Sequence, residues 1–265
     1  MSEQTPIILT TDFGVEDVYV GVLKGVILSI NRSAAIVDLT HFIRPQDVHQ
    51  AAVIIHENYR YFPDGSVHLC IVDPGVGTDR KIIAIRAYNQ FFVGPDNGVF
   101  SKIITAEQPV AIYQVSNRSQ FLEKISNTFH GRDIMAPIAA RISSGISIDT
   151  VGPRLGQEDC VTILLRKPEL KNNRLVGEIE SVDRFGNLIT NIVRDDLKPF
   201  NGLENLQILL KSHVILFNEG SYGDSAENRA AALLNSSERL EICVRNGSAA
   251  DQLHAQVGEQ VIVQR

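Results

Sequence analysis

The chain has 265 residues, of which 44% are hydrophobic and 21% charged, and its formal net charge is −6. This length and hydrophobic content allow one large domain or two modest ones with a core that needs no covalent support. Because the balance is acidic and no Lys/Arg-rich block is present, we expect no nucleic-acid partner. No apolar run is long enough to span a bilayer, so we expect no membrane association.

The three cysteines, Cys70, Cys160 and Cys243, are widely spaced and form no C-x-x-C pair. They therefore indicate neither a disulfide framework nor a cysteine-based zinc site, and they fit a reducing compartment. The first residues, 1–4, are polar and lack a basic region followed by an apolar one, so no signal peptide is expected. These features predict a cytoplasmic protein.

The first half of the chain alternates short apolar runs with stretches of helical spacing. We expect strands at 7–11, 35–37, 67–72, 82–87, 91–93 and 110–115, and helices at 17–30, from 45 through 55 and at 133–144. Asp17 is the expected N-cap of the first helix, and Pro45 is expected in the first turn of the second. Such alternation predicts an α/β domain over residues 1–166, with a mostly parallel sheet and helices on both faces.

The pattern changes after about residue 161. The stretch 166–174 is rich in Lys, Pro and Asn and is expected to be a linker. Short β-like runs follow at 175–182, 188–193, 206–210, 214–217, 240–244 and 261–263, and only 225–234 has helical character. Short strands at this spacing predict a second domain, residues 175–265, that is a small β-barrel or sandwich.

The most informative segment is I-V-D-P-G-V-G-T-D-R-K at 71–81. An apolar run ends at Asp73, a Pro/Gly turn follows, and Arg80 precedes the next apolar run. Ligand sites of α/β proteins lie at such strand ends. Taken alone, however, the segment favours a plainer interpretation, in which Asp73 caps the turn and Arg80 is solvated.

Three expected strands of the first domain end in carboxylates, Asp12, Asp38 and Asp73, and these could share one crevice. A carboxylate such as Asp12 offers two adjacent acceptors and can bind both hydroxyls of a ribose, although it could equally cap the following turn. No G-x-G-x-x-G lies near the first strand, which disfavours a dinucleotide site.

His130 stands between a loop and a helix beside a glycine, a position that fits a functional or a structural histidine equally well. Three further histidines, with Asp38, could be considered as metal ligands: His41, His49 and His56. Their spacing places one in a loop and two on a helix, which is not a convergent geometry, so no metal is expected.

Three loops of the second domain carry more polar residues than a hairpin needs. The segment 181–191 has a dense polar tip, and the segments 218–223 and 245–250 are Gly-bearing loops after apolar runs. Glycines let the backbone approach a ligand closely. Each loop could therefore bind a ligand or be a plain hairpin connection.

Together these segments resemble one family, the S-adenosyl-L-methionine (SAM) hydroxide adenosyltransferases, adenosine-forming SAM hydrolases related to fluorinase and chlorinase. The matching segments are T-T-D-F-G at 10–14, I-V-D-L-T-H at 36–41, V-D-P-G-V-G-T-D-R-K at 72–81, G-P-D-N-G at 94–98, F-H-G-R-D at 129–133, D-R-F-G-N-L-I-T-N at 183–191 and R-N-G-S-A-A at 245–250. They span nearly the whole chain in the family's order, which makes the resemblance specific.

The resemblance implies an N-terminal α/β domain, a C-terminal β-barrel, and a homotrimer in which SAM lies between domains of neighbouring subunits. It implies that Asp73, Arg80 and His130 form the family's catalytic set, which the halogenases lack. The expected reaction is therefore in-line attack of water at C5′ of SAM, giving adenosine and L-methionine without a cofactor. Which of Asp73 and His130 would take the proton is left open.

Further roles follow from the resemblance position by position. Asp12 would bind the ribose hydroxyls. The remaining contacts would come from the second domain: Asp183 and Ser221 to the methionine group, Asn187 and Asn246 to the adenine, and Tyr222 as a wall.

Three alternatives stay open. The protein could be a halide-using adenosyltransferase, a non-catalytic SAM or adenosine sensor, or a metal-dependent phosphohydrolase that uses the Asp and His residues at strand ends.

Overall fold

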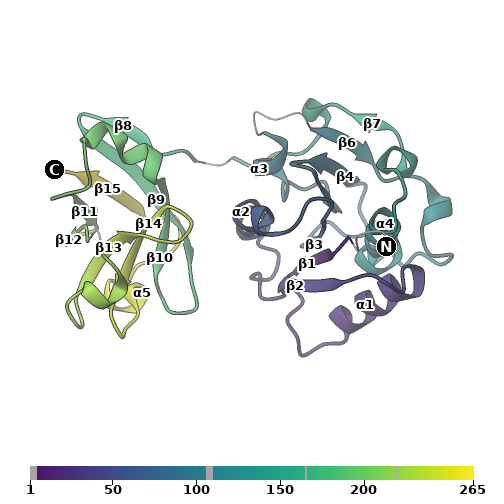
Figure 1. Ribbon diagram of the computed structural model, residues 1–265, viewed down its shortest axis with the longest axis horizontal. Coiled ribbons are helices and arrows are strands. Elements are labelled where there is room, and N and C mark those ends of the chain that lie inside the picture. The colour runs from purple at the N-terminus through teal and green to yellow at the C-terminus, as the bar shows by residue number, and fades with distance from the viewer. Residues whose placement is uncertain (1–4, 106–109, 165, 219) are drawn as a thin grey trace. The chain divides into compact units, whose positions relative to one another are not determined.

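The computed structural model describes residues 5–105, 110–164, 166–218 and 220–265. The N-terminal segment 1–4 and Glu219, which belongs to the second of the three polar loops, lie outside the described residues. The chain divides into two compact units, residues 1–164 and 165–265 (Figure 1).

The N-terminal unit is built on a seven-stranded sheet in the order β2-β1-β3-β5-β4-β6-β7. Its strands are β1 (Ile7–Thr11), β2 (Ile36–Thr40), β3 (Val67–Ile71), β4 (Ile82–Ala87), β5 (Gln90–Pro95), β6 (Ala111–Gln114) and β7 (Arg154–Leu155). Four neighbours, β2, β1, β3 and β5, are parallel, and β4 runs against both β5 and β6. Only β4 and β7 therefore oppose the common direction, and the predicted mostly parallel sheet is confirmed.

Helices cover both faces of this sheet. They are α1 (Tyr19–Ile30), α2 (Val48–Asn58), α3 (Ser101–Ile104) and α4 (Ala136–Ser143), with a π-helical turn at Gly131–Met135 and 3-10 turns at Tyr59–Tyr61, Arg118–Gln120, Ile148–Val151 and Gln157–Asp159. One core holds the buried sides of α1 and α4, and the other holds those of α2 and α3. Leu69 and Ile71 belong to the first core while Cys70 and Val72 belong to the second, as expected for alternating side chains of a strand buried on both faces.

Two expected helix starts were wrong. The N-cap of α1 is Val18 rather than Asp17, and no side chain caps this helix. In α2 the N-cap is Asp47, whose carboxylate accepts a hydrogen bond from Gln50 N at 2.8 Å, so Pro45 lies before the helix. A carboxylate that can accept from the backbone N–H three residues later is a stronger signal for a helix start than a proline, because it satisfies an otherwise unpaired N–H.

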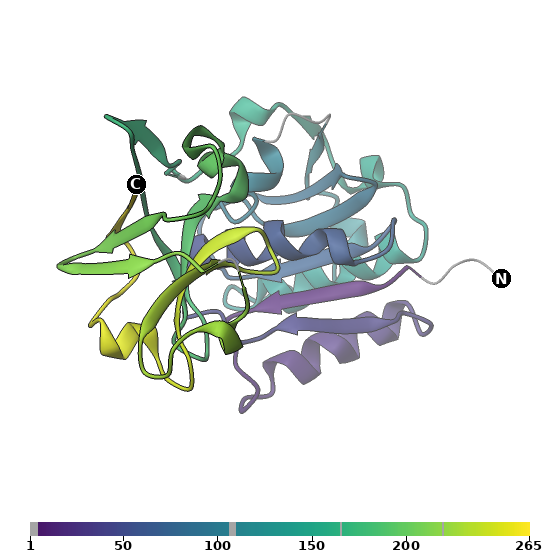
Figure 2. The same cartoon turned by 60° about the vertical axis from the view of Figure 1, so that its left-hand side comes forward.

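The C-terminal unit is an antiparallel, nearly closed barrel of eight strands, which confirms the predicted barrel fold. The strands are β8 (Glu169–Lys171), β9 (Arg174–Val182), β10 (Leu188–Val193), β11 (Gln207–Leu210), β12 (His213–Leu216), β13 (Ala230–Leu234), β14 (Arg239–Val244) and β15 (Gln260–Gln264). Helix α5 (Ala249–Gln252) and the 3-10 turns Arg194–Phe200 and Tyr222–Asp224 complete the unit. The order is β12-β11-β15-β9-β10-β14-β13 with β8 on β9, and a bridge between Phe217 and Ala232 links the two ends. Figure 2 shows these strands in the green and yellow part of the ribbon.

Two expectations for this unit were wrong. The segment expected to be helical, 225–234, ends in strand β13, because its alanines and leucines alternate between the barrel core and a second layer that contains Cys243. The expected linker at 166–174 holds β8 and the start of β9. Asn172 and Asn173 turn this hairpin with φ of 49° and 58°, the left-handed values that a two-residue hairpin turn requires.

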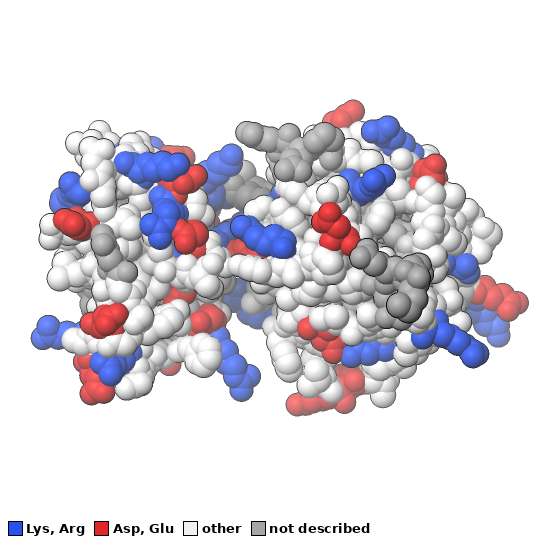
Figure 3. Space-filling view, in the orientation of Figure 1, with Lys and Arg blue, Asp and Glu red and all other residues white. Residues whose placement is uncertain are grey.

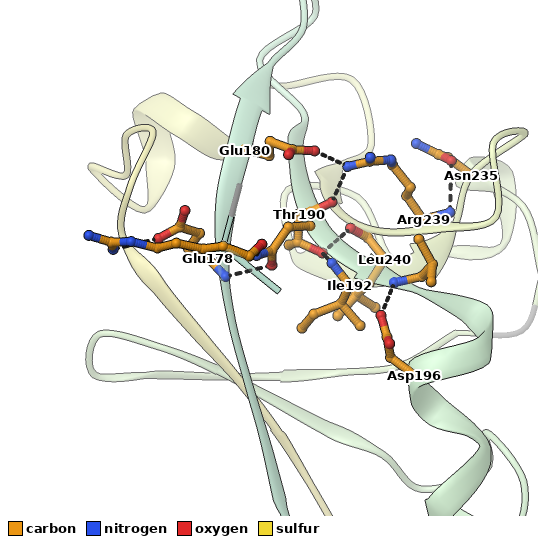
Figure 4. A network of polar contacts seen from close by, with 11 residues as sticks. Glu178, Glu180, Thr190, Ile192, Asp196, Asn235, Arg239 and Leu240 are labelled. Atoms are coloured by element: carbon orange, nitrogen blue, oxygen red, sulfur yellow. Dashed lines mark hydrogen bonds and ion pairs between the residues drawn. The ribbon is translucent and has the colours of Figure 1, made fainter. Parts of the chain in front are cut away.

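A buried polar network braces the barrel (Figure 4). The guanidinium of Arg239 donates to the Glu180 carboxylate and to Thr190 O at 3.0 Å. Thr190 Oγ1 in turn donates to Leu240 O at 2.8 Å. Asn191 also bonds to the backbone of its own unit, accepting from Glu178 N at 2.9 Å. Some of the polar residues at 181–191 therefore have a structural role.

Charges of both signs are interspersed over the face in Figure 3. Among the described residues, no helix is long and apolar enough to cross a membrane.

Candidate functional site

Asp73 lies just beyond the end of β3, at the start of a tight turn. Val76 N donates to Asp73 O at 3.2 Å, and Thr78 N donates to Gly75 O at 3.1 Å. Gly77 has φ of 80°, and a Cβ there would lie 2.5 Å from Asn127 O. Only glycine fits this combination of left-handed backbone and close approach. The turn thus returns the chain so that Arg80 faces Asp73.

Asp73 and Arg80 form a bidentate ion pair. Arg80 Nε lies 2.8 Å from Asp73 Oδ1 and Arg80 Nη2 lies 2.5 Å from Oδ2. Their side chains are only 6% and 10% exposed. The carboxylate is therefore bound to arginine instead of capping the turn, and the guanidinium is not solvated, so the plainer interpretation of this segment does not hold.

The same guanidinium reaches His130. Arg80 Nη2 lies 3.0 Å from His130 Nδ1. A guanidinium has donors only, so Nδ1 must accept, and the neutral imidazole then carries its proton on Nε2. Burial, followed by the charge of Arg80, lowers the pKa of His130, while Asp73 and Asp133 raise it less. This environment keeps the imidazole neutral at physiological pH.

Two neighbouring segments fix the positions of these groups. Gly131, which begins the π-helical turn after His130, would place a Cβ 2.9 Å from the side chain of Ile71 in β3. Asn97, in the loop after β5, donates to Val72 O at 2.9 Å, one residue before Asp73. Strand end and helix start are therefore packed directly against each other.

A cavity of about 470 Å³ opens beside this array. Its polar lining includes Asp12, Asp73 and His130. Asp12 Oδ2 accepts from Gln46 N at 2.8 Å, and Gln46 has a left-handed φ of 67°. Strained backbone of this kind is concentrated at functional sites.

Three aromatic rings line the same cavity and pack against one another: Phe13, Tyr19 and Phe129, with ring centroids 5.3 to 5.8 Å apart. The sequence did not single out these rings or Gln46 as site residues. Only the inclusion of Phe13 in T-T-D-F-G and of Phe129 in F-H-G-R-D could have indicated two of them.

Asp38 does not join Asp12 and Asp73 in the crevice. It lies within β2 rather than at its end, and pairs with Lys24 and His41. Within the described part of the chain, no group of three or more His, Cys, Asp or Glu is arranged to hold a metal ion.

A second groove, of about 800 Å³, lies in the C-terminal unit. It is lined by four of the residues that the sequence assigned to substrate contacts: Asp183, Asn187, Tyr222 and Asn246. Ser221 precedes Tyr222 but is not part of the lining. Apart from Ser221, the structure therefore gathers the predicted residues into one cluster within each unit.

Several of these groups already have partners inside their own unit. Asp183 accepts from Phe185 N at 2.8 Å and from Asn187 Nδ2 at 2.9 Å, so it also caps its turn. The hydroxyl of Ser221 donates to Asp224 at 2.9 Å. Ser221 would have to exchange this bond to contact a ligand.

A buried carboxylate holds the side chain of Tyr222 in place. Its hydroxyl donates to Glu241 at 2.7 Å, and Glu241 is only 2% exposed. Burial, and then this hydrogen bond, raise the pKa of Tyr222.

Known proteins match both units. The N-terminal domain model of the SAM hydroxide adenosyltransferases matches residues 7–152, and the C-terminal domain model matches residues 177–262. The chain belongs to the SAM hydroxide adenosyltransferase family. Its relatives include an (R)-S-adenosyl-L-methionine hydrolase from Thermus thermophilus, 33% identical over 97% of this chain and 98% of the relative.

Two further matches place this family member among its relatives. A fluorinase from Nocardia brasiliensis is 31% identical over 71% of each chain. The crystal structure of an uncharacterised conserved protein from Thermotoga maritima superposes with a TM-score of 0.91 at 36% identity, covering 98% of this chain and 100% of that one. The family of this chain therefore contains hydrolases as well as a halogenase, so family membership alone does not identify the nucleophile.

Proposed function

We propose that this SAM hydroxide adenosyltransferase hydrolyses SAM to adenosine and L-methionine. The observation that carries the proposal is the contiguous Asp73–Arg80–His130 array on the border of a cavity that Asp12 also lines. The relatives named (R)-S-adenosyl-L-methionine hydrolase support the same reaction and suggest the (R)-sulfonium epimer as substrate.

The chemistry needs little more than this array. Sulfur leaves SAM as a neutral thioether, so no general acid is required. The oxygen of water attacks C5′, the C5′–S bond breaks, and its electron pair goes to sulfur. Water is a weak nucleophile and must be aligned behind C5′ and deprotonated.

In the neutral tautomer, His130 Nε2–H donates to the oxygen of the nucleophile, and Asp73 is then the proton acceptor of the set. Arg80 holds the Asp73 carboxylate in place and fixes the tautomer of His130. We therefore assign proton removal to Asp73 and orientation of the water to His130.

The remaining residues supply binding. Asp12 Oδ1 makes no hydrogen bond to the described residues, so this oxygen can accept from the ribose hydroxyls. In the C-terminal groove, Asn187 and Asn246 would contact the adenine, Asp183 and Ser221 the methionine group, and Tyr222 would form a wall. We propose that this groove serves the cavity of a neighbouring subunit in a homotrimer.

Four finer expectations stay predictions. They are domain bounds of 1–166 and 175–265, a cytoplasmic location, the absence of nucleic-acid or membrane partners, and activity without a cofactor.

The decisive experiment is chromatography of SAM incubated with the protein without added metal. Wild type should release adenosine and methionine in equal amounts from the (R)-epimer. Asp73→Asn and His130→Ala should each lower kcat by about a hundredfold or more, the size of a general-base contribution. Absence of adenosine at high enzyme concentration would refute the proposal.

Three further arms separate the alternatives. Added chloride or fluoride should yield no 5′-halo-5′-deoxyadenosine, whereas a halide-using enzyme would form it. Chelator should leave the rate unchanged, which a metal-dependent enzyme would not allow. A sensor would bind SAM in calorimetry without turnover.

A further inference from the structure

A chain of polar contacts lies behind Asp12, among residues to which the proposed chemistry gives no role. It starts at helix α1, where Lys24 Nζ lies 2.6 Å from Asp38 Oδ2. Asp38 Oδ1 lies 3.1 Å from His41 Nε2, and His41 Nδ1 lies 2.9 Å from Thr11 Oγ1. This series of contacts thus links α1, β2 and the end of β1, one residue before Asp12.

The proton positions along this chain are determined by its ends. A carboxylate facing His41 Nε2 favours the neutral tautomer with its proton on that nitrogen. Nδ1 is then an acceptor, so the Thr11 hydroxyl donates to it. Thr11 Oγ1 in turn accepts from Phe13 N at 3.3 Å. The hydroxyl is thereby held in one rotamer, between the ring of His41 and the backbone beyond Asp12.

The order hydroxyl, imidazole, carboxylate is also that of a hydrolase triad, but Thr11 is fully buried and His41 is 4% exposed. No substrate could reach this hydroxyl. This series of polar contacts can instead influence the backbone on either side of Asp12. Further hydrogen bonds hold the same segment in place. Gly14 N donates to His41 O at 2.7 Å and Ile43 N to Thr11 O at 3.3 Å.

We propose that Asp38, His41 and Thr11 form a positioning array that aims the Asp12 carboxylate at the ribose hydroxyls, with Lys24 balancing the charge of Asp38. This inference rests on the proposed function, because it takes Asp12 as the ribose contact. It gives the I-V-D-L-T-H segment a role in substrate binding in place of the metal role that its residues did not fit.

Strand β1 offers a matched control. Thr10 precedes Thr11, is 1% exposed, and its hydroxyl has no hydrogen-bond partner in the described part of the chain. Thr10→Val and Thr11→Val therefore make the same isosteric change at adjacent buried positions, and only the second breaks the array. Thr11→Ser keeps the hydroxyl and should restore the wild-type behaviour.

The experiment measures kcat and KM for SAM in these variants. Thr11→Val should raise KM between about threefold and tenfold, the effect of one lost hydrogen bond, with kcat within about twofold of wild type. Thr10→Val and Thr11→Ser should match wild type. A purely structural role would instead lower the active fraction, and hence the apparent kcat, at unchanged KM.

Calorimetry with adenosine and 2′,3′-dideoxyadenosine tests the site directly. Thr11→Val should weaken adenosine but leave the dideoxy compound unchanged, because only adenosine has the hydroxyls that Asp12 contacts. Asp38→Ala, at a side chain 41% exposed, should act in the same direction and serves if Thr11→Val does not fold.

The outcomes are distinguishable. If wild type turns over SAM but Thr11→Val has the KM and the ligand discrimination of Thr10→Val, the positioning array is overturned and the proposed function stands. If wild type does not turn over SAM, both are overturned.

Discussion

Arg80 is the residue on which the proposed site depends most. It uses Nε and Nη2 to contact Asp73 and shares Nη2 with His130, so one planar group fixes both partners. A lysine keeps the charge but presents a single nitrogen. We expect Arg80→Lys to lower kcat by about a hundredfold or more, because the water then loses its aligned partners. Initial rates at saturating SAM measure this directly.

Arg86→Lys is the matched control. Arg86 is exposed on β4, the strand that follows Arg80, and the same exchange there should leave kcat unchanged. If Arg80→Lys were as active as Arg86→Lys, charge alone would suffice, and the bidentate geometry would have no catalytic role.

Sequence, through the family resemblance, grouped Asp73, Arg80 and His130, although the local pattern at 71–81 alone favoured a turn cap at Asp73 and a solvated Arg80. It could not identify the array behind Asp12. Thr11 and His41 are 30 residues apart and meet only because β1 and β2 are neighbours in the sheet. Asp38 misled for the same reason, since its partner Lys24 lies on a helix.

At the scale of elements, the packing of a helix start against a strand end positions His130. Gly131 leaves no room for a methyl group beside Ile71. We expect Gly131→Ala to push the π-helical turn away from β3, to cost about 1–3 kcal/mol of stability, and to lower kcat. Urea denaturation and initial rates together measure both effects.

Gly25→Ala, in the exposed interior of α1, is the comparison. A Cβ there meets nothing within 4 Å. Because alanine has the higher helix propensity, this variant should gain about 0.5–1 kcal/mol and keep wild-type kcat. Destabilisation of both variants to the same extent would show that close packing at Gly131 is not the cause.

The type of an element was predictable where the spacing of its apolar residues is decisive, as in β1, β3 and β4. The predictions were wrong where pairing with another strand decides the structure. Residues 230–234, Ala-Ala-Ala-Leu-Leu, favour helix by propensity but form β13, because β14 offers a full ladder of backbone hydrogen bonds. The hairpin at Asn172 was missed because the Asn-Asn turn was interpreted as part of a linker.

The stability of the whole molecule should depend on pH through His68, a core residue remote from the proposed chemistry. His68 is 1% exposed, stacks on Phe92 at 4.9 Å, and its Nε2 lies 2.5 Å from Gln90 Oε1. Gln90 Nε2 donates to backbone oxygens, so Oε1 is the acceptor and His68 Nε2 carries the proton. Nδ1 is buried without a hydrogen-bond partner among the described residues.

Burial lowers the pKa of His68 from 6.5 to about 4. The folded state therefore favours the neutral ring, and the unfolded state takes up a proton first as the pH falls. Stability from this residue is complete above pH 6.5 and declines as the pH falls from 6.5 to about 4, by about 3 kcal/mol. Urea denaturation across this range, with His68→Leu beside wild type, isolates the contribution from that of the carboxylates.

His68→Leu should be less stable than wild type at neutral pH, because Gln90 Oε1 loses its partner, and the difference should shrink or reverse towards pH 4. His213→Leu, at an exposed histidine that begins β12, should run parallel to wild type. A wild-type curve parallel to that of His68→Leu would mean that the buried ring takes up its proton as readily in the folded state as in the unfolded chain. The neutral ring would then contribute nothing to the acid sensitivity of the fold.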